Sequence, residues 1–148
     1  PSILYGPGSE IVAMLGLLAR LPLVPIPRLT AAFRPIHVRD AARIVVDAAV
    51  SSAETDYIPL VGPERLTATE VAATFLRARG TAIVPIPARV SQLVVRVASR
   101  VKLPGAPADL APMLAIDNAG SAPPEADRRT RYSDWVVRAD RRESLPGG

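Results

Sequence analysis

The sequence predicts an α/β fold, because short apolar segments alternate along the chain with stretches whose apolar residues recur at helical spacing. Apolar residues follow single helical stripes in residues 11–21 and again in residues 71–78. Short apolar runs with strand-like composition lie between the stripes, and residues 82–86 are one of them. Because a few short strands cannot bury their faces alone, we expect them at the far edge of a larger sheet.

The first residues predict a strand that runs into a turn. Residues 2–5 are mostly apolar, and a Gly-Pro-Gly sequence follows at residues 6–8. A strand with no chain before it suggests that the polypeptide is a fragment of a larger domain. Ser9 is expected to cap the first helix, and the prolines within residues 22–27 then force an extended path.

The next part of the chain predicts two strands with a helix between them. Residues 33–38 are expected to form the first of these strands. Asp40 is expected to cap a helix that runs through Val50. Residues 57–61 are the second candidate, and Pro59 assigns that strand to an edge or an irregular position.

The clearest local signal is the start of a helix near residue 67. Thr67 and Glu70 have the spacing of a capping box, while Leu66 and Val71 have the spacing of a hydrophobic staple. Gly80 is a suitable terminator, because glycine readily adopts the left-handed conformation that ends many helices.

The last third of the chain predicts helices separated by a long loop. Residues 90–101 carry a further helical stripe, and arginines gather on a separate face of it. We expect one short helix at residues 113–116 and a loop at residues 119–129. The final helix is expected to have Ser133 as its cap and the pair Tyr132 and Val137 as its staple.

Composition predicts one modest domain over residues 1–140 and a disordered tail at residues 141–148. The chain has no cysteine, which excludes disulfides and fits a reducing cytoplasm. No apolar run reaches the roughly 20 residues that a membrane span needs. The net charge is +4, but aromatic residues for base stacking are few, so we expect no nucleic-acid partner.

The sequence contains no self-sufficient catalytic or metal-binding motif. The sequence lacks the Gly-rich dinucleotide loop, the Walker loop and the Gly-x-Ser-x-Gly elbow. His37 is the only histidine and no acidic cluster accompanies it, so we expect no bound metal. We assign no catalytic residue, and the simplest interpretation is that His37 ends a strand while Asp40 caps a helix.

Several weak motifs nevertheless follow one another in a recognisable order. Residues 1–8 resemble an Arg-Pro-x-x-x-Tyr-Gly-Pro-Gly stretch that lacks only its leading Arg. Residues 33–42 resemble Pro-hydrophobic-His-Val-x-Asp-Val-Ala, and residues 57–70 resemble Tyr-x-hydrophobic-x-Gly-Pro-Glu-x-Leu-Thr-x-x-Glu. Looser matches occur at residues 84–87 and 113–118.

In this order, over roughly residues 1–138, the motifs resemble the C-terminal part of extended and atypical short-chain dehydrogenases/reductases. The atypical branch, which includes the NADPH-binding accessory subunit of respiratory complex I and bacterial epimerase-like proteins, is the most similar. The resemblance implies the C-terminal portion of a Rossmann-like fold that binds NAD or NADP, with edge strands and a small substrate lid. Two departures stand out. Phe33 replaces the Arg of sugar-nucleotide epimerases, and the chain contains no Tyr-x-x-x-Lys pair.

The resemblance also implies which residues line the cleft. The residues beside the nicotinamide, which they contact mostly through backbone atoms, would be Pro1, Ser2 and Ile3. The residues that border the substrate would be Gly6, Arg34 and His37. The alternative is that all six are turn and strand residues without ligand contact.

Two functions follow from the resemblance. The first is a fragment of an NAD(P)-dependent oxidoreductase or epimerase-like enzyme, which acts on an unidentified small molecule. The alternative is a non-catalytic NAD(P)H-binding structural or assembly protein, peripheral to a membrane. A basic stripe formed by Arg89, Arg96, Arg100 and Lys102 favours this alternative, although most amphipathic stripes pack on their own core.

Overall fold

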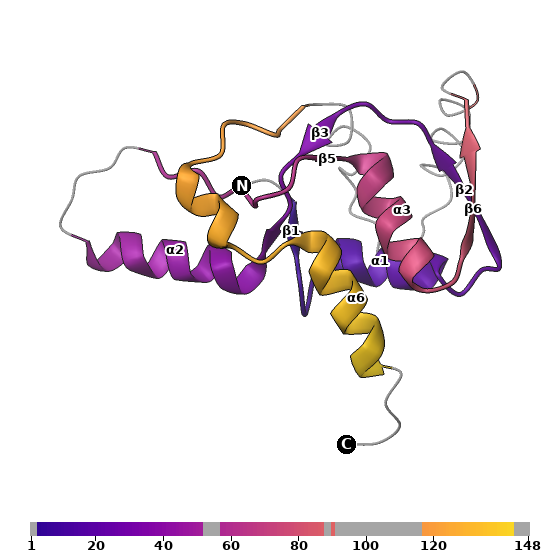
Figure 1. Cartoon of the computed structure of the whole chain (residues 1–148), viewed down its shortest axis with the longest axis horizontal. Helices are drawn as coiled ribbons and strands as arrows, with labels where there is room; N and C mark the ends of the chain where they lie inside the picture. The colour runs from indigo at the N-terminus through magenta and orange to yellow at the C-terminus, as the bar shows by residue number, and fades with distance from the viewer. Residues whose placement is uncertain (1–2, 52–56, 88–89, 91–116, 144–148) are drawn as a thin grey trace.

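The chain is a mixed α/β protein, described by a computed structural model over residues 3–51, 57–87, 90 and 117–143 (Figure 1). The α/β class predicted from the sequence is therefore confirmed. In chain order the elements are β1 (Leu4–Tyr5), α1 (Glu10–Leu18), β2 (Leu23–Pro27), β3 (Ala32–Phe33), β4 (Ile36–His37), α2 (Val38–Val50), β5 (Leu66–Thr67), α3 (Ala68–Ala78), β6 (Ala82–Ile86), the 3₁₀ helix η1 (Pro124–Arg128) and α6 (Tyr132–Glu143).

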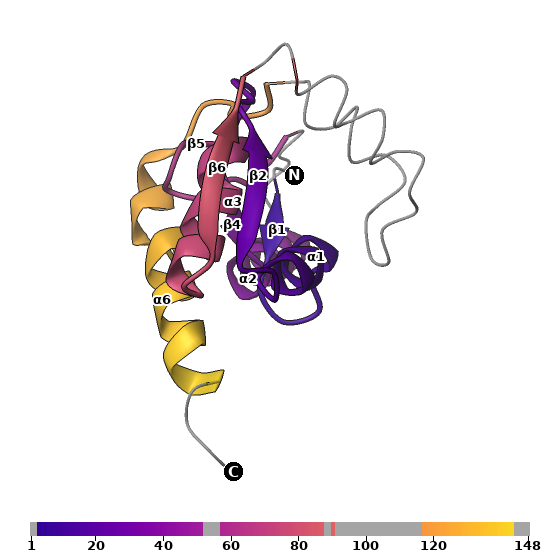
Figure 2. The same cartoon turned by 90° about the vertical axis from the view of Figure 1, so that its right-hand side faces the viewer.

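The strands pair two by two. β1 runs parallel to β4, with Leu4 opposite Ile36 and Tyr5 opposite His37. β2 runs parallel to β6 along their full length, and β3 runs antiparallel to β5. Figure 2 shows β2 and β6 side by side, with α3 against them. Within the described residues these are three small sheets rather than one continuous sheet.

Helix α3 is the centre of the fold, because it buries two of its faces. One face packs against α1 and α6, and the other packs against the β2–β6 pair. The first contact belongs to a cluster of Tyr5, Leu15, Val71, Phe75, Tyr132 and Val136. The second belongs to a cluster of Val24, Ile26, Ala73 and Leu76. A helix with apolar residues on two faces is typical of such an interior position.

The predicted start and end of α3 are confirmed. The hydroxyl of Thr67 accepts a hydrogen bond from the Glu70 amide at 3.2 Å, and the Glu70 carboxylate accepts one from the Thr67 amide at 2.7 Å. Gly80 follows the helix with a φ of 73°. These are the two halves of a capping box and a left-handed terminator.

The start of α1 is confirmed as well, but the helix is shorter than its apolar stripe. The Ser9 hydroxyl accepts a hydrogen bond from the Val12 amide at 3.4 Å. The helix ends at Leu18, and Leu21 is 50% exposed. Pro22 follows Leu21, and the residue before a proline is disfavoured in helical conformation.

The prediction of one strand over residues 33–38 is wrong. Two short strands, β3 and β4, flank Arg34 and Pro35, and proline cannot donate a ladder hydrogen bond. Helix α2 begins at Val38 with His37 as its cap, and Nδ1 of His37 accepts the Arg39 amide at 3.2 Å. Asp40, the expected cap, instead accepts a hydrogen bond from the Thr130 amide at 2.8 Å.

Two strand assignments also change. Residues 57–61 form no strand: Tyr57 is 80% exposed, and Pro59 has no amide to donate. The strand of this region is β5, which pairs with β3. Conversely, the proline-rich segment at residues 22–27, which is predicted only to be extended, contains strand β2. Among the described strands, β2 pairs with β6 alone. Prolines are tolerated in a strand with a partner on one side only.

The C-terminal predictions need three corrections. The expected loop over residues 119–129 contains η1. Helix α6 begins at Tyr132, so Ser133 lies in its first turn rather than at its cap, and Val137 is 48% exposed while Tyr132 is buried. The helix continues to Glu143, beyond the predicted domain boundary at residue 140. The helices predicted at residues 90–101 and 113–116 lie, apart from Val90, outside the described residues, as do residues 144–148.

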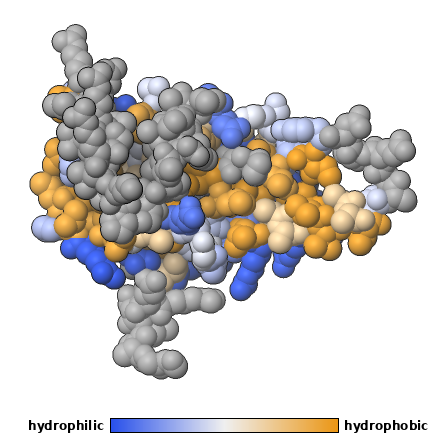
Figure 3. Space-filling view, turned by 180° about the vertical axis from the view of Figure 1, so that it is seen from behind, coloured by the Kyte–Doolittle hydropathy of each residue, from blue (hydrophilic) through white to orange (hydrophobic). Residues whose placement is uncertain are grey.

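Apolar side chains remain on the surface, most clearly on α2. Only Ala41 of this helix is buried, whereas Val45, Val46 and Val50 are 53%, 59% and 79% exposed. In the view from behind, α2 lies on the right, and hydrophobic residues gather over that part of the surface (Figure 3). No helix in the described part of the chain is long and apolar enough to cross a membrane.

Candidate functional site

The parallel pair β1–β4 creates the candidate site, because both strands end at the same edge and both lead to helices. After β1 the chain turns at Gly6 and enters α1, while β4 leads directly into α2. Ligands in open α/β folds bind outside the carboxyl ends of parallel strands. The structure therefore brings Gly6 and His37, two of the predicted substrate residues, to one edge.

Gly6 allows the backbone to approach His37 closely. Its φ is 127°, a conformation that residues with a side chain rarely adopt. A Cβ at this position would lie 2.9 Å from Cγ1 of Val38 and 3.1 Å from Nε2 of His37. The predicted Gly-Pro-Gly turn is thus a place where bare backbone faces an imidazole.

His37 is nearly enclosed, with only 7% of its surface exposed. The ring of Tyr5 meets it edge-on at 5.3 Å between centroids, and Trp135 of α6 lies at 6.2 Å. Burial lowers the pKa of His37; the nearby Asp40 raises it and Arg39 lowers it further. Because Nδ1 accepts the Arg39 amide, the neutral ring carries its proton on Nε2.

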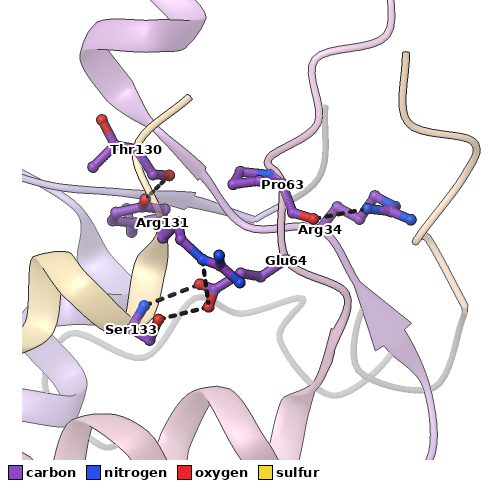
Figure 4. Close-up of polar contacts among 7 residues, drawn as sticks. Arg34, Pro63, Glu64, Thr130, Arg131 and Ser133 are labelled. Carbon is purple, nitrogen blue, oxygen red and sulfur yellow. Dashed lines mark hydrogen bonds and ion pairs between the residues drawn. The ribbon is translucent and has the colours of Figure 1, made fainter. Parts of the chain in front are cut away.

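Arg34, the third predicted substrate residue, points elsewhere. Its guanidinium donates to the carbonyl of Pro63 at 3.0 Å, as Figure 4 shows. Arg34 and His37 flank Pro35 and Ile36, yet their side chains contact different segments. This is the expected consequence of the break between β3 and β4.

The predicted cofactor residues lie at the start of β1. Pro1 and Ser2 are outside the described residues. The carbonyl of Ile3 accepts the Ile36 amide at 2.9 Å. The Ile3 side chain is buried and lines an apolar cavity of about 150 Å³ between α1, β2 and α3.

Sequence reasoning missed a set of polar contacts that attach residues 129–133 to the rest of the fold, here called the clasp. The Tyr5 hydroxyl donates to the Thr130 carbonyl at 2.7 Å. Glu64 accepts hydrogen bonds from the Ser133 amide at 3.0 Å and the Ser133 hydroxyl at 2.6 Å (Figure 4). Arg129 also belongs to the clasp, since it donates to the Val61 carbonyl. The only available signal was Glu64 in the Gly-Pro-Glu motif.

The tyrosines near the site are structural donors rather than titrating groups. Burial raises the pKa of Tyr5, and the carboxylates of Asp40 and Glu64 raise it further. Burial also raises the pKa of Tyr132, whose hydroxyl donates to the Val71 carbonyl at 3.0 Å. Both stay protonated at neutral pH, so neither is the phenolate of a proton relay.

The candidate site therefore consists of the buried Gly6 backbone and one buried, neutral imidazole. No group of three histidine or acidic side chains in the described ranges could hold a metal ion. In comparisons with known proteins, the sequence matches no protein-family model and no curated protein, so any functional proposal depends on the site itself.

Proposed function

We propose that this chain is the C-terminal part of an NAD(P)-binding, Rossmann-like protein of the short-chain dehydrogenase/reductase type. The observation that carries the proposal is the β1–β4 pair, whose parallel strands both lead to helices and whose shared edge holds Gly6 against His37. Leu4 of β1 is 41% exposed, and β4 is the only described partner of β1. Further parallel strands are expected to continue the sheet beside β1.

Within such a protein, this chain contributes binding and positioning. The hydroxyls of Tyr5 and Tyr132 and the carboxylate of Glu64 are all engaged in hydrogen bonds that hold the fold together. Because these polar groups hold the fold together, they also support the second candidate function, which is a non-catalytic NAD(P)H-binding structural or assembly protein. A cytoplasmic location belongs to the same proposal.

The upstream gene sequence separates the two candidates. A Tyr-x-x-x-Lys pair before Pro1 supports an oxidoreductase or epimerase-like enzyme, and its absence supports the non-catalytic role. A Gly-rich loop in that sequence is expected in both cases, because it supplies the helix N-terminus that binds the pyrophosphate.

Calorimetric titration of NADH and NADPH into two proteins tests the proposal. The protein that includes the upstream sequence is expected to bind one of them, and the 148-residue chain alone is expected to bind neither. Micromolar binding by the isolated chain, or no binding by the longer protein, would overturn the proposal.

A pair of glycine variants of the longer protein tests the site. Gly6→Ala places a methyl group 2.9 Å from Val38 and is expected to weaken cofactor or substrate binding. Gly8→Ala is the matched control, since its φ of 82° is also positive but an added Cβ meets nothing within 4 Å. Equal effects of the two variants would argue against a ligand at the Gly6 edge.

A further inference from the structure

A second cavity, of about 380 Å³, lies at the C-terminal half of α2, whereas the candidate site lies at the N-terminus of that helix. It is formed by the last turns of α2, by Ile58 and Pro59, and by Pro123, Glu125 and Arg129, and none of the predicted site residues lines it. Its volume is within the range of small-molecule pockets. Apolar walls come from Ile44, Ile58 and Pro59.

Three charged side chains meet at this cavity. Arg129 lines it and, through one guanidinium N–H, donates to the Val61 carbonyl. Among the described residues, no carboxylate pairs with that guanidinium. Asp47 from α2 and Glu125 from η1 line the cavity too, and within the same residues neither carboxylate has an ion-pair partner.

The charges around the cavity favour a ligand that carries one positive and one negative group. Two carboxylates and one guanidinium leave a net charge of −1, and the C-terminus of α2 adds the negative end of its dipole. No basic residue in the last turn of α2 compensates that end. An ammonium group therefore satisfies the carboxylates, while a carboxylate satisfies the planar fork of Arg129.

We propose that this cavity binds a free α-amino acid with a medium-sized apolar side chain. The ligand carboxylate pairs with Arg129, the ammonium lies near Asp47 and Glu125, and the side chain packs on the apolar walls. A simple amine would leave Arg129 without a carboxylate partner. A simple carboxylic acid would meet the repulsion of Asp47 and Glu125.

Titration of the chain with three related ligands, followed by amide NMR shifts, tests the proposal. Leucine carries both charges, 3-methylbutylamine lacks the carboxylate, and 4-methylpentanoate lacks the ammonium. Leucine is expected to shift the amides of Ala48, Ser51 and Ile58, all of which line the cavity. The two truncated ligands are expected to bind at least about five-fold more weakly, since each loses one charge-assisted contact.

Two variants at exposed positions check the assignment of the ammonium site. Asp47→Asn and Glu125→Gln are each expected to weaken leucine binding about three- to ten-fold. Asp127→Asn is the control, because Asp127 also lies on η1 but does not line the cavity. The proposal is overturned if leucine shifts no amide up to its solubility limit, if the amine alone binds as tightly as leucine, or if all three variants behave alike. None of these outcomes depends on NAD(P) binding.

Discussion

Single carboxylates connect distant parts of this chain, and Glu64 is the clearest case. It accepts two hydrogen bonds from Ser133, which is 69 residues away in sequence, and lies 3.5 Å from the Arg131 guanidinium. Burial alone would raise the pKa of Glu64, but the bonds from Ser133 and the charge of Arg131 lower it. The ionised carboxylate therefore stabilises the N-terminus of α6.

Replacement of Glu64 by Gln is expected to lower the free energy of unfolding by about 1–2 kcal/mol at neutral pH, because charge-assisted hydrogen bonds are lost. The folded pKa lies below the ordinary value near 4.5, so this contribution is present above that pH and is lost as pH falls through the folded pKa. Urea denaturation at neutral pH and at roughly pH 3 measures both effects. Glu10→Gln, at an exposed residue, is the control. An equal change in both variants would contradict the role of Glu64.

The single histidine is expected to make stability pH-dependent. The pKa of His37 is lowered in the folded protein, so its contribution is present above the unfolded value of 6.5 and is lost as pH falls through the folded pKa. His37→Asn keeps an acceptor for the Arg39 amide but cannot titrate. Denaturation midpoints between roughly pH 5 and pH 8 are expected to fall with acid in the natural chain and to stay nearly level in the variant. Parallel profiles would show that the imidazole is not responsible.

Among the structural elements, the connection between β3 and β4 depends on a close backbone approach. The Gly62 amide donates to the Arg34 carbonyl at 3.1 Å. A Cβ on Gly62 would lie 1.7 Å from the Pro35 carbonyl oxygen, so only glycine fits there. The Gly of the Gly-Pro-Glu motif thus holds the segment that carries Glu64 against the strands.

Two glycine-to-alanine variants should therefore have opposite effects. Gly62→Ala is expected to destabilise the fold by more than about 3 kcal/mol, because the backbones must separate. Gly16→Ala, inside α1 where nothing lies within 4 Å of an added Cβ, is expected to stabilise it by roughly 0.5–1 kcal/mol. Thermal denaturation of both variants measures the difference. A mild effect of Gly62→Ala would contradict the close approach.

At the scale of the whole molecule, the exposed apolar side chains predict association. Val46 and Val50 of α2 and Leu23 of β2 are each more than half exposed, and large apolar patches are uncommon on soluble monomers. The purified chain is expected to bind a hydrophobic dye or to self-associate. If the chain is part of the larger protein proposed above, joining the rest of that protein to it in one polypeptide is expected to suppress both.

Dye fluorescence and light scattering on the two proteins, side by side, measure this prediction. The variant Val46→Glu in the isolated chain is expected to reduce dye binding, whereas Arg43→Glu, which introduces the same charge at an exposed position of α2 without removing an apolar side chain, is the control. A monodisperse chain that binds no dye and unfolds cooperatively would contradict the proposal that it is part of a larger domain.

The candidate site was only partly predictable. Sequence reasoning named Gly6 and His37 through motifs at two strand ends, and the β1–β4 register does bring them together. It also named Arg34, but the strand is broken at Pro35, and the Arg34 guanidinium donates to the Pro63 carbonyl instead. Whether two strand ends meet depends on pairing between segments about thirty residues apart, and no local pattern specifies that pairing.

The sequence by itself determined the features that depend on neighbouring residues. Ser9 starts α1, the Thr67–Glu70 pair starts α3 and Gly80 ends it, because each acts through hydrogen bonds or backbone angles within one helical turn. Tertiary structure alone decided the rest. His37 rather than Asp40 caps α2, since Asp40 bonds to Thr130 ninety residues away. The spacing of residues along the sequence does not show which distant group will bind a given side chain.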